Sequence, residues 1–226
     1  MNKDVLVVAA HPDDEVLFCG ATIAKHAHQG DRVHILIVAE GLTSRDENVA
    51  AEQRAELREA STKAARILGA KSIELGGLPD QMLDTLPFLD LVKLVERHVE
   101  KHAPEIIYTH HGGDLNMDHR LLNQAVMTAA RPIPGRNFEG IYAGETLSST
   151  EYSAPSVASS FIPSHHVDVA GLVECKIEAL KAYEMEMREF PHARSYDAVR
   201  ALSVLRGAQV GRLAAEAFVT LRTTWG

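Results

Sequence analysis

Six apolar residues, Val5-Leu6-Val7-Val8-Ala9-Ala10, run directly into the polar segment His11-Pro12-Asp13-Asp14-Glu15. A short apolar run of this kind predicts a strand buried on both faces, as strands are in a parallel sheet. The segment 16–29 that follows has a helical composition and stops at Gly30. The stretch therefore predicts a strand, a charged turn and a helix, which together form the first unit of a parallel α/β sheet.

Strand-like and helix-like segments continue to alternate up to residue 144. Short, mainly apolar segments predict further strands at 32–39, 72–76, 105–110 and 140–144. Longer segments with charged residues predict helices at 48–68, 88–102 and 119–130. Such alternation is typical of a doubly wound sheet. We therefore predict a Rossmann-like α/β fold with a mainly parallel sheet of core order 3-2-1-4-5 and helices on both faces.

The C-terminal third departs from this alternation. Residues 146–165 are rich in Ser, Thr, Pro and Tyr and show no periodicity, which predicts a loop over the functional site. Two helices are expected after it, at 170–187 and 196–222. We assign 1–226 to a single domain, with 146–195 as an active-site loop and C-terminal extension.

The composition excludes several classes of protein. Hydrophobic residues make up 46% of the 226 residues, and the net charge of −8 disfavours binding to nucleic acid or to an anionic membrane by bulk electrostatics. Cys19 and Cys175 are too few for a disulfide framework. No segment approaches the roughly 20 apolar residues of a membrane span, and no secretory signal is recognisable. We expect a cytoplasmic protein.

Residues that can bind a metal follow two strands that are neighbours in the predicted order. His11-Pro12-Asp13-Asp14-Glu15 follows the first strand, and 110–120, with further histidines and carboxylates, follows the fourth. Ligands of open parallel sheets bind beyond the carboxyl ends of the strands. Two histidines, a carboxylate and an open position make a catalytic zinc site, although iron, cobalt or manganese also suit such ligands. The absence of a G-x-G-x-x-G motif after the first strand argues against a dinucleotide-binding enzyme.

Two motifs carry a family resemblance. Ala10-His11-Pro12-Asp13-Asp14-Glu15 and Asn116-Met117-Asp118-His119 resemble the LmbE/PIG-L family of zinc-dependent N-deacetylases. Further matches extend over almost the whole chain, at 79–80, 145–150, 190–195, 206–207 and 215–218, and the C-terminal ones resemble a bacterial subgroup associated with surface-polysaccharide sugars. The resemblance implies a hydrolase that removes an acetyl group from the nitrogen of an amino sugar.

The resemblance also implies roles for individual residues. It implies that His11, Asp14 and His119 hold one Zn²⁺ and that Asp13 is the catalytic base, which can return its proton to the departing amine. Asn116 stands where other branches often have a histidine, so stabilisation of the oxyanion is open. Asn116 itself or one of three histidines could supply it: His110, His111 or His192. Asp118 is expected either to orient these groups or simply to favour the start of a helix.

Residues for substrate binding are less well defined. The family commonly places a substrate-binding arginine on the helix after the second strand, where Arg54 and Arg58 both lie, and ordinary surface charge is the alternative for each. Asp80 follows a strand end, where it could accept hydrogen bonds from sugar hydroxyls or simply be an exposed turn residue. Arg194 and Arg206 are candidate phosphate ligands, which would suit a nucleotide-linked sugar; the alternative for Arg206-Gly207 is that it fixes the packing of the last helix.

Three other functions remain open at this point. An amidase for a glucosamine-containing thiol would need an acidic pocket that accommodates sulfur. A metal-dependent phosphoesterase would hold two metals about 3.5–4 Å apart. A sugar-binding protein without turnover is the third. The expected partner is a small amino-sugar substrate, and a homo-oligomer is possible.

Overall fold

The strands form one sheet with the predicted core order. The computed structural model describes residues 2–40, 47–157 and 159–225, with the backbone alone for 47–53. The order in the sheet is β3-β2-β1-β4-β5-β7-β6. The first five strands are parallel, whereas β7 runs antiparallel to both β5 and β6. The bounds are β1 (Asp4–Ala9), β2 (Arg32–Ala39), β3 (Ser72–Leu78), β4 (Ile106–His110), β5 (Gly140–Gly144), β6 (His165–Asp168) and β7 (Ala215–Thr223).

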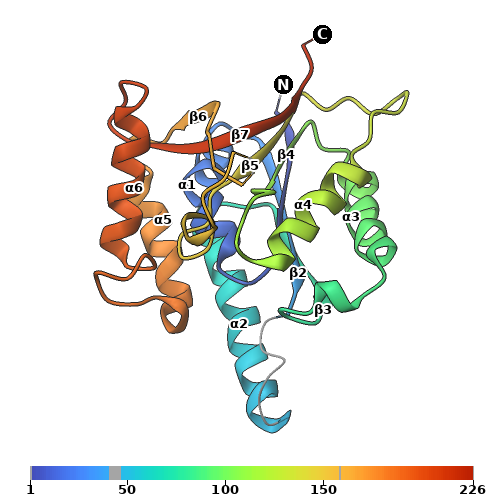
Figure 1. Cartoon of the computed structure of the whole chain (residues 1–226), viewed down its shortest axis with the longest axis horizontal. Helices are drawn as coiled ribbons and strands as arrows, with labels where there is room; N and C mark the ends of the chain where they lie inside the picture. Colours follow the sequence, from blue (N-terminus) through green and yellow to red (C-terminus); the bar gives the residue numbers. More distant parts are fainter. Residues whose placement is uncertain (1, 41–46, 158, 226) are drawn as a thin grey trace.

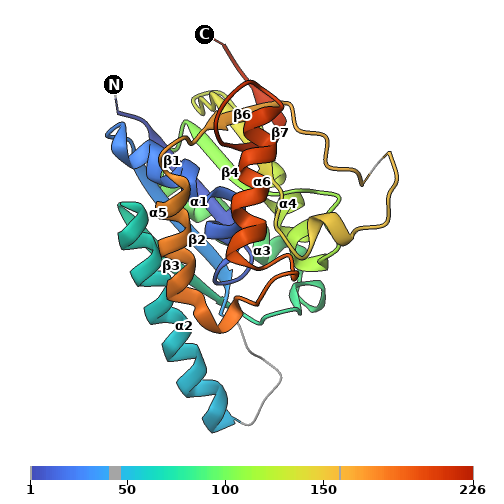
Figure 2. The same ribbon diagram turned by 90° about the vertical axis from the view of Figure 1, so that its left-hand side faces the viewer.

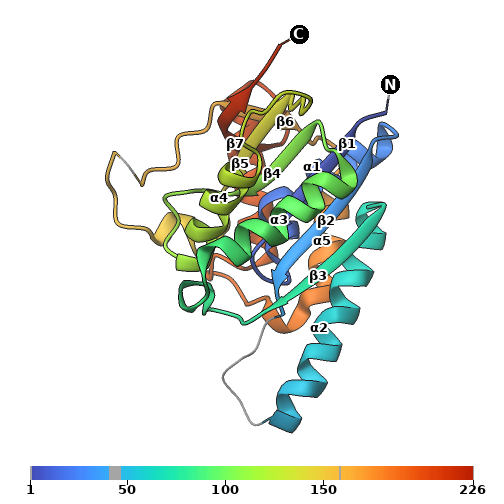
Figure 3. The same cartoon turned by 90° about the vertical axis from the view of Figure 1, so that its right-hand side faces the viewer.

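Helices cover both faces of the sheet, which separates two helical layers in Figure 1. One layer contains α3 (Phe88–His102) and α4 (Met117–Ala129), which lie over the sheet in Figure 3. The other layer faces the viewer in Figure 2 and contains α1 (Asp14–His28), α2 (Glu47–Leu68), α5 (Val173–Leu180) and α6 (Tyr196–Ala208). Short 3-10 helices complete the fold: η1 (Leu83–Thr85), η2 (Thr150–Tyr152) and η3 (Lys181–Glu186). The predicted doubly wound architecture is confirmed.

β1 supplies the centre of both hydrophobic cores. Val5, Val7 and Ala9 pack with α1, α2 and α5, whereas Leu6 and Val8 pack with α3 and α4. All five side chains are fully buried. Burying one Val or Leu side chain contributes about 1.5–3 kcal/mol to folding, so β1 stabilises the packing of both helical layers on the sheet. Its position also determines where the polar turn that follows it lies.

The prediction of one long helix over 196–222 is wrong in its second half. α6 ends at Ala208, and Ala215–Thr223 is the strand β7. Glu216 explains the difference, because its buried carboxylate accepts hydrogen bonds from the Lys176 ammonium and from the backbone N–H groups of Ala21 and Thr22 in α1. These long-range contacts outweigh the local helix propensity of the Ala and Glu residues.

The other C-terminal predictions need smaller corrections. The helix expected at 170–187 is divided into α5 and the 3-10 helix η3. The loop expected at 146–165 contains the short helix η2 and ends where β6 begins. Within the described part of the chain, no helix is both long and apolar enough to cross a membrane.

Candidate metal centre and active-site cavity

The turn between β1 and α1 places three of the candidate residues. β1 ends at Ala9, and α1 begins at Asp14. Asp13 lies in this turn with a φ of 104°, a backbone conformation that costs a non-glycine residue roughly 1–3 kcal/mol. Strain of this kind is concentrated at functional sites, where it fixes the direction of a side chain.

The loop after β4 opens at the same edge of the sheet, because β4 is the parallel neighbour of β1. Asn116 is the N-cap of α4, and its side-chain oxygen accepts the backbone N–H of Asp118 at 2.9 Å. The first turn of α4 carries His119. As a result, His11 and His119 lie side by side although 108 residues separate them in the sequence.

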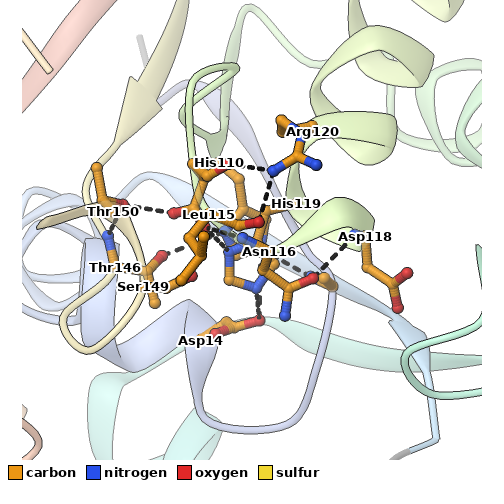
Figure 4. A network of polar contacts seen from close by, with 12 residues as sticks. Asp14, His110, Leu115, Asn116, Asp118, His119, Arg120, Thr146, Ser149 and Thr150 are labelled. Atoms are coloured by element: carbon orange, nitrogen blue, oxygen red, sulfur yellow. Dashed lines mark hydrogen bonds and ion pairs between the residues drawn. The ribbon is translucent and has the colours of Figure 1, made fainter. Parts of the chain in front are cut away.

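The three predicted ligands form a compact triangle of donor atoms. Asp14 Oδ2 is 3.1 Å from His11 Nδ1 and 3.1 Å from His119 Nε2, and the two nitrogens are 3.4 Å apart. Figure 4 shows Asp14 facing the His119 ring. Ligands of a tetrahedral zinc, each about 2.0–2.1 Å from the ion, are separated by roughly 3.4 Å. The donor atoms and their spacing therefore fit one zinc ion. In addition, Asp14 Oδ1 is buried and has no hydrogen-bond partner among the described residues, as expected for a carboxylate that binds an ion.

Without a metal, charges of opposite sign meet at this triangle. Burial lowers the pKa of His11, but hydrogen bonds to Asp118 and Asp14 outweigh burial and raise this pKa to about 10. Burial likewise lowers the pKa of His119, and the charge of Asp14 together with Asp114 raises it to about 9. Burial raises the pKa of Asp14, but its histidine neighbours hold it well below the ordinary value. Metal binding must therefore displace two imidazole protons.

Asp118 lies behind His11. Its Oδ2 atom is 3.1 Å from His11 Nε2, and its Oδ1 atom accepts the backbone N–H of Leu83 at 3.1 Å. In Figure 4 the Asp118 side chain points away from Asp14. A carboxylate on the second nitrogen of a histidine fixes the tautomer and the ring orientation of that histidine. This geometry suits Asp118 to orient His11.

Asp114 stands in the corresponding position behind His119. Its Oδ1 atom is 3.2 Å from His119 Nδ1. The hydroxyl groups of Ser149 and Thr150 donate hydrogen bonds to the Asp114 carboxylate. Burial acts to raise the pKa of Asp114, but the hydrogen bond with His119 and its charge, followed by the two hydroxyl groups, lower this pKa to about 2. Both candidate histidine ligands thus have a buried carboxylate behind them.

Asp13 is held by an arginine from the C-terminal part of the chain. Arg194 Nη1 donates to Asp13 Oδ2 at 2.6 Å, and Arg194 Nε donates to Ser148 Oγ at 2.7 Å. The Asp13 N–H donates to Glu15 at 3.1 Å, and Glu15 in turn accepts the hydroxyl of Tyr183 at 2.6 Å. Burial raises the pKa of Asp13 well above its ordinary value, and the Arg194 charge opposes this shift.

His110 is buried and neutral. The backbone N–H of Ala10 donates to His110 Nε2 at 2.9 Å, so the proton of the ring is on Nδ1, which faces Thr146 Oγ1 at 3.2 Å. Burial first, and the neighbouring His119 second, lower the pKa of His110 to about 3. His110 stacks on His119 with ring centroids 3.8 Å apart. It therefore packs against a candidate ligand and is unsuited to act as a charged donor.

A cavity of about 240 Å³ opens beside the triangle. His11, Asp13 and His119 line it together with polar side chains from several elements. The other lining residues are Pro12, Leu57, Asp80, Gln81, Asn116, Ser148, Ser149, Glu186 and Arg194. Asn116 Nδ2 donates to Gln81 Oε1 at 3.2 Å, so its amide N–H groups face this part of the cavity. Asp80 also approaches His11, with its Oδ1 atom 3.2 Å from His11 Nε2.

Several residues predicted to bind substrate lie outside the described lining of this cavity. Arg58 is exposed and pairs with Glu40, and Arg54 lies one turn earlier on α2. His192 is exposed in a turn, where its Nδ1 atom accepts the backbone N–H of Arg194 at 3.0 Å. The candidate phosphate ligand Arg206 makes a bidentate pair with Glu145, with both distances 2.6 Å.

Asp114, Glu15 and Gln81 also belong to the site, although they are not among the residues expected from the sequence. Asp114 was detectable, because it precedes His119 by five residues in the same polar loop and histidine ligands usually have a carboxylate partner. Glu15 belongs to the acidic run that contains Asp14. Gln81 directly follows Asp80, so its position after a strand end was a signal that it could reach the site.

Residues 6–130 match the PIG-L family, described as GlcNAc-PI de-N-acetylase. A relative from Escherichia coli K12, the uncharacterized deacetylase YaiS, is 30% identical over 72% of this chain and 80% of that protein. The diacetylchitobiose deacetylase of Thermococcus kodakarensis is 28% identical over 83% of this chain and 71% of that protein. The chain belongs to the PIG-L family and is, like these relatives, an enzyme of the deacetylase class.

The fold also occurs in an enzyme with another activity. The solved structure of GalB, the 4-carboxy-2-hydroxymuconate hydratase of Pseudomonas putida KT2440, superposes with a TM-score of 0.77 at 22% identity and covers 99% of both chains. The architecture alone therefore does not fix the reaction, and the residues of the site must carry the argument for a particular substrate.

Proposed function

We propose that this protein is a zinc-dependent hydrolase that removes the N-acetyl group from a small amino sugar. The observation that carries the proposal is the donor triangle of His11, Asp14 and His119. Asp13, a buried carboxylate that is not part of this triangle, lines the same cavity. One carboxylate is thus available to the metal and a second one to a proton.

When bound, zinc would lower the pKa of a coordinated water to about 7 and polarise the substrate carbonyl. The protein's own groups would supply the proton transfers. Asp13 is held in one orientation by Arg194, and burial raises its pKa, which favours acceptance of a proton near neutral pH. The same carboxyl group can then give this proton to the departing amine. Asn116, which lines the same cavity as His119, is suited to donate a hydrogen bond to the carbonyl oxygen as negative charge develops.

The cavity favours a substrate of about monosaccharide size. Its volume of about 240 Å³ lies below the range of roughly 300–1,000 Å³ of sites for drug-sized ligands. Its polar lining suits hydroxyl groups, with Asp80 and Glu186 as acceptors and Gln81 as both donor and acceptor. The relative from Thermococcus kodakarensis, by its name, acts on an N-acetylated sugar, which supports the same substrate class.

The test is to incubate zinc-loaded protein with a panel of N-acetylated sugars, free and nucleotide-linked, and to assay released acetate. We expect turnover of at least one free N-acetylhexosamine derivative. The matched control is Asp13→Asn, which keeps the size of the side chain. Its acetate release should fall by about 10²–10⁴-fold while its zinc content stays unchanged.

Two outcomes would contradict the proposal. Release of phosphate from phosphate esters, without release of acetate, would favour the phosphoesterase alternative. Tight sugar binding without turnover by the zinc-loaded protein would indicate a binding protein.

A further inference from the structure

A second group of metal-binding side chains lies at the opposite end of the sheet. His98 and His102 are one turn apart at the end of α3, and Glu74 lies near the start of β3. Each of the three offers a ligand atom within 4.8 Å of the other two. Two histidines at i and i+4 face the same side of a helix, which is the spacing with which helices chelate zinc.

The group is already held in place before any ion binds. Gly76, two residues after Glu74 on the same side of β3, packs so tightly on α3 that a Cβ atom there would lie 2.8 Å from the Leu94 side chain. Leu94 is one helical turn before His98. The close packing of β3 on α3 therefore lies next to Glu74 and His98. His102 Nε2 is 3.7 Å from Glu74 Oε1.

The His102 ring is fixed by a neighbour that is itself anchored. His34 of β2 stacks on His102 with ring centroids 3.9 Å apart. The Nδ1 atom of His34 is 2.7 Å from Ser72 Oγ, and its Nε2 atom is 3.5 Å from Asp4 Oδ1. These contacts reduce the rotamer freedom that His102 would lose when it binds an ion.

We propose that Glu74, His98 and His102 form a structural site for a divalent cation of the zinc type, separate from the catalytic centre. A ligand set of two imidazoles and one carboxylate suits Zn²⁺. The site would join β3, an edge strand of the sheet, to the last turn of α3. Edge strands have one unpaired side, so a cross-link at this position stabilises the sheet where it is least supported.

The two sites lie far apart. Glu74 lies four residues before β3 ends at Leu78, or roughly 13 Å along the strand, and Asp80 of the catalytic cavity follows that end. The last turn of α3 adds to the attraction of a cation, because the carbonyl end of a helix is electronegative. Lys101 opposes it, since its ammonium donates to Glu74 Oε1 at 2.5 Å and competes for that ligand.

The test uses His119→Ala protein, in which the catalytic triangle is broken, and titrates it with Zn²⁺ against a chromophoric chelator. We expect one zinc ion to bind per chain and the unfolding temperature to rise with it. Adding His102→Ala or Glu74→Gln should weaken zinc binding at least tenfold. The Glu74→Gln change keeps the packing, so its effect does not depend on refolding around a cavity. His28→Ala, at an exposed histidine of α1, is the matched control and should change nothing.

Lys101→Met gives an opposite and more specific signature. Removing the competing ammonium frees Glu74, so zinc affinity should increase if the carboxylate is a ligand. The proposal is wrong if His119→Ala protein binds no zinc, or if it binds zinc equally well with and without Glu74 and His102. If this site is confirmed, two zinc ions per chain would be expected from two separate sites. A count of two would then not indicate a two-metal phosphoesterase.

Discussion

Binding of zinc at the catalytic triangle should release about two protons per ion near neutral pH. The pKa of His11 is raised to about 10 and that of His119 to about 9, so at pH 7.5 both rings are almost fully protonated in the metal-free protein. Each must lose its proton to bind zinc. Two rings with an ordinary pKa of about 6.5 would together release only about 0.2 protons at this pH.

Proton release is measured on addition of zinc to the His102→Ala variant, in which only the catalytic site should bind the ion. Isothermal titration in buffers of different ionisation enthalpy, at fixed pH, gives the number of protons released. A coordinated water can add at most about one further proton, because its pKa falls to about 7. The expected total at pH 7.5 is therefore about 2 to 3.

A total near or below about one proton would instead mean that the neighbouring carboxylates do not keep these rings protonated. The pH dependence of affinity provides a second reading of the same quantity. Between pH 6 and 8 the zinc affinity should rise by about a hundredfold per pH unit, as expected when two protons compete with one ion.

Three other predictions follow from the same contacts. Metal-free protein should lose stability as the pH rises from about 6.5 to 10, because protonated His11 and His119 stabilise the folded state and lose their protons over this range. Thermal unfolding measured with and without zinc checks this. Asp114→Asn should weaken zinc binding by about 10–100-fold in chelator competition, and an unchanged affinity would remove its positioning role. Arg194→Met should shift the acidic limb of the pH–rate profile upward through Asp13 without loss of zinc, and an unmoved limb would contradict their coupling.

The first two thirds of the fold were predictable because each buried strand is a short apolar run and each helix ends at a clear boundary. Val5 to Ala10 illustrates this: alternate residues serve both cores, so the run is apolar throughout. The same run places the functional turn, since polar residues after a buried strand must emerge at the edge of the sheet. The core order 3-2-1-4-5 then brings the loops after β1 and β4 together.

The C-terminal part was less predictable because its structure depends on distant partners. β7 contains Ala215 and Glu216, which favour helix locally, yet Glu216 is buried against Lys176 and the α1 backbone. The contact between Arg194 and Asp13 spans 181 residues. Nothing near Arg194 in the sequence indicates which carboxylate it meets, and the sequence suggested only a phosphate role for it.

The proposed function requires that His11, Asp14 and His119 share one metal ion. The most direct measurement is an anomalous-difference map from crystals of zinc-loaded protein, recorded at the zinc absorption edge. We expect a peak about 2.0–2.2 Å from His11 Nδ1, an Asp14 oxygen and His119 Nε2, with Asp13 outside the coordination sphere. A fully loaded crystal with no peak between these three donors, or with Asp13 as a ligand, would contradict it.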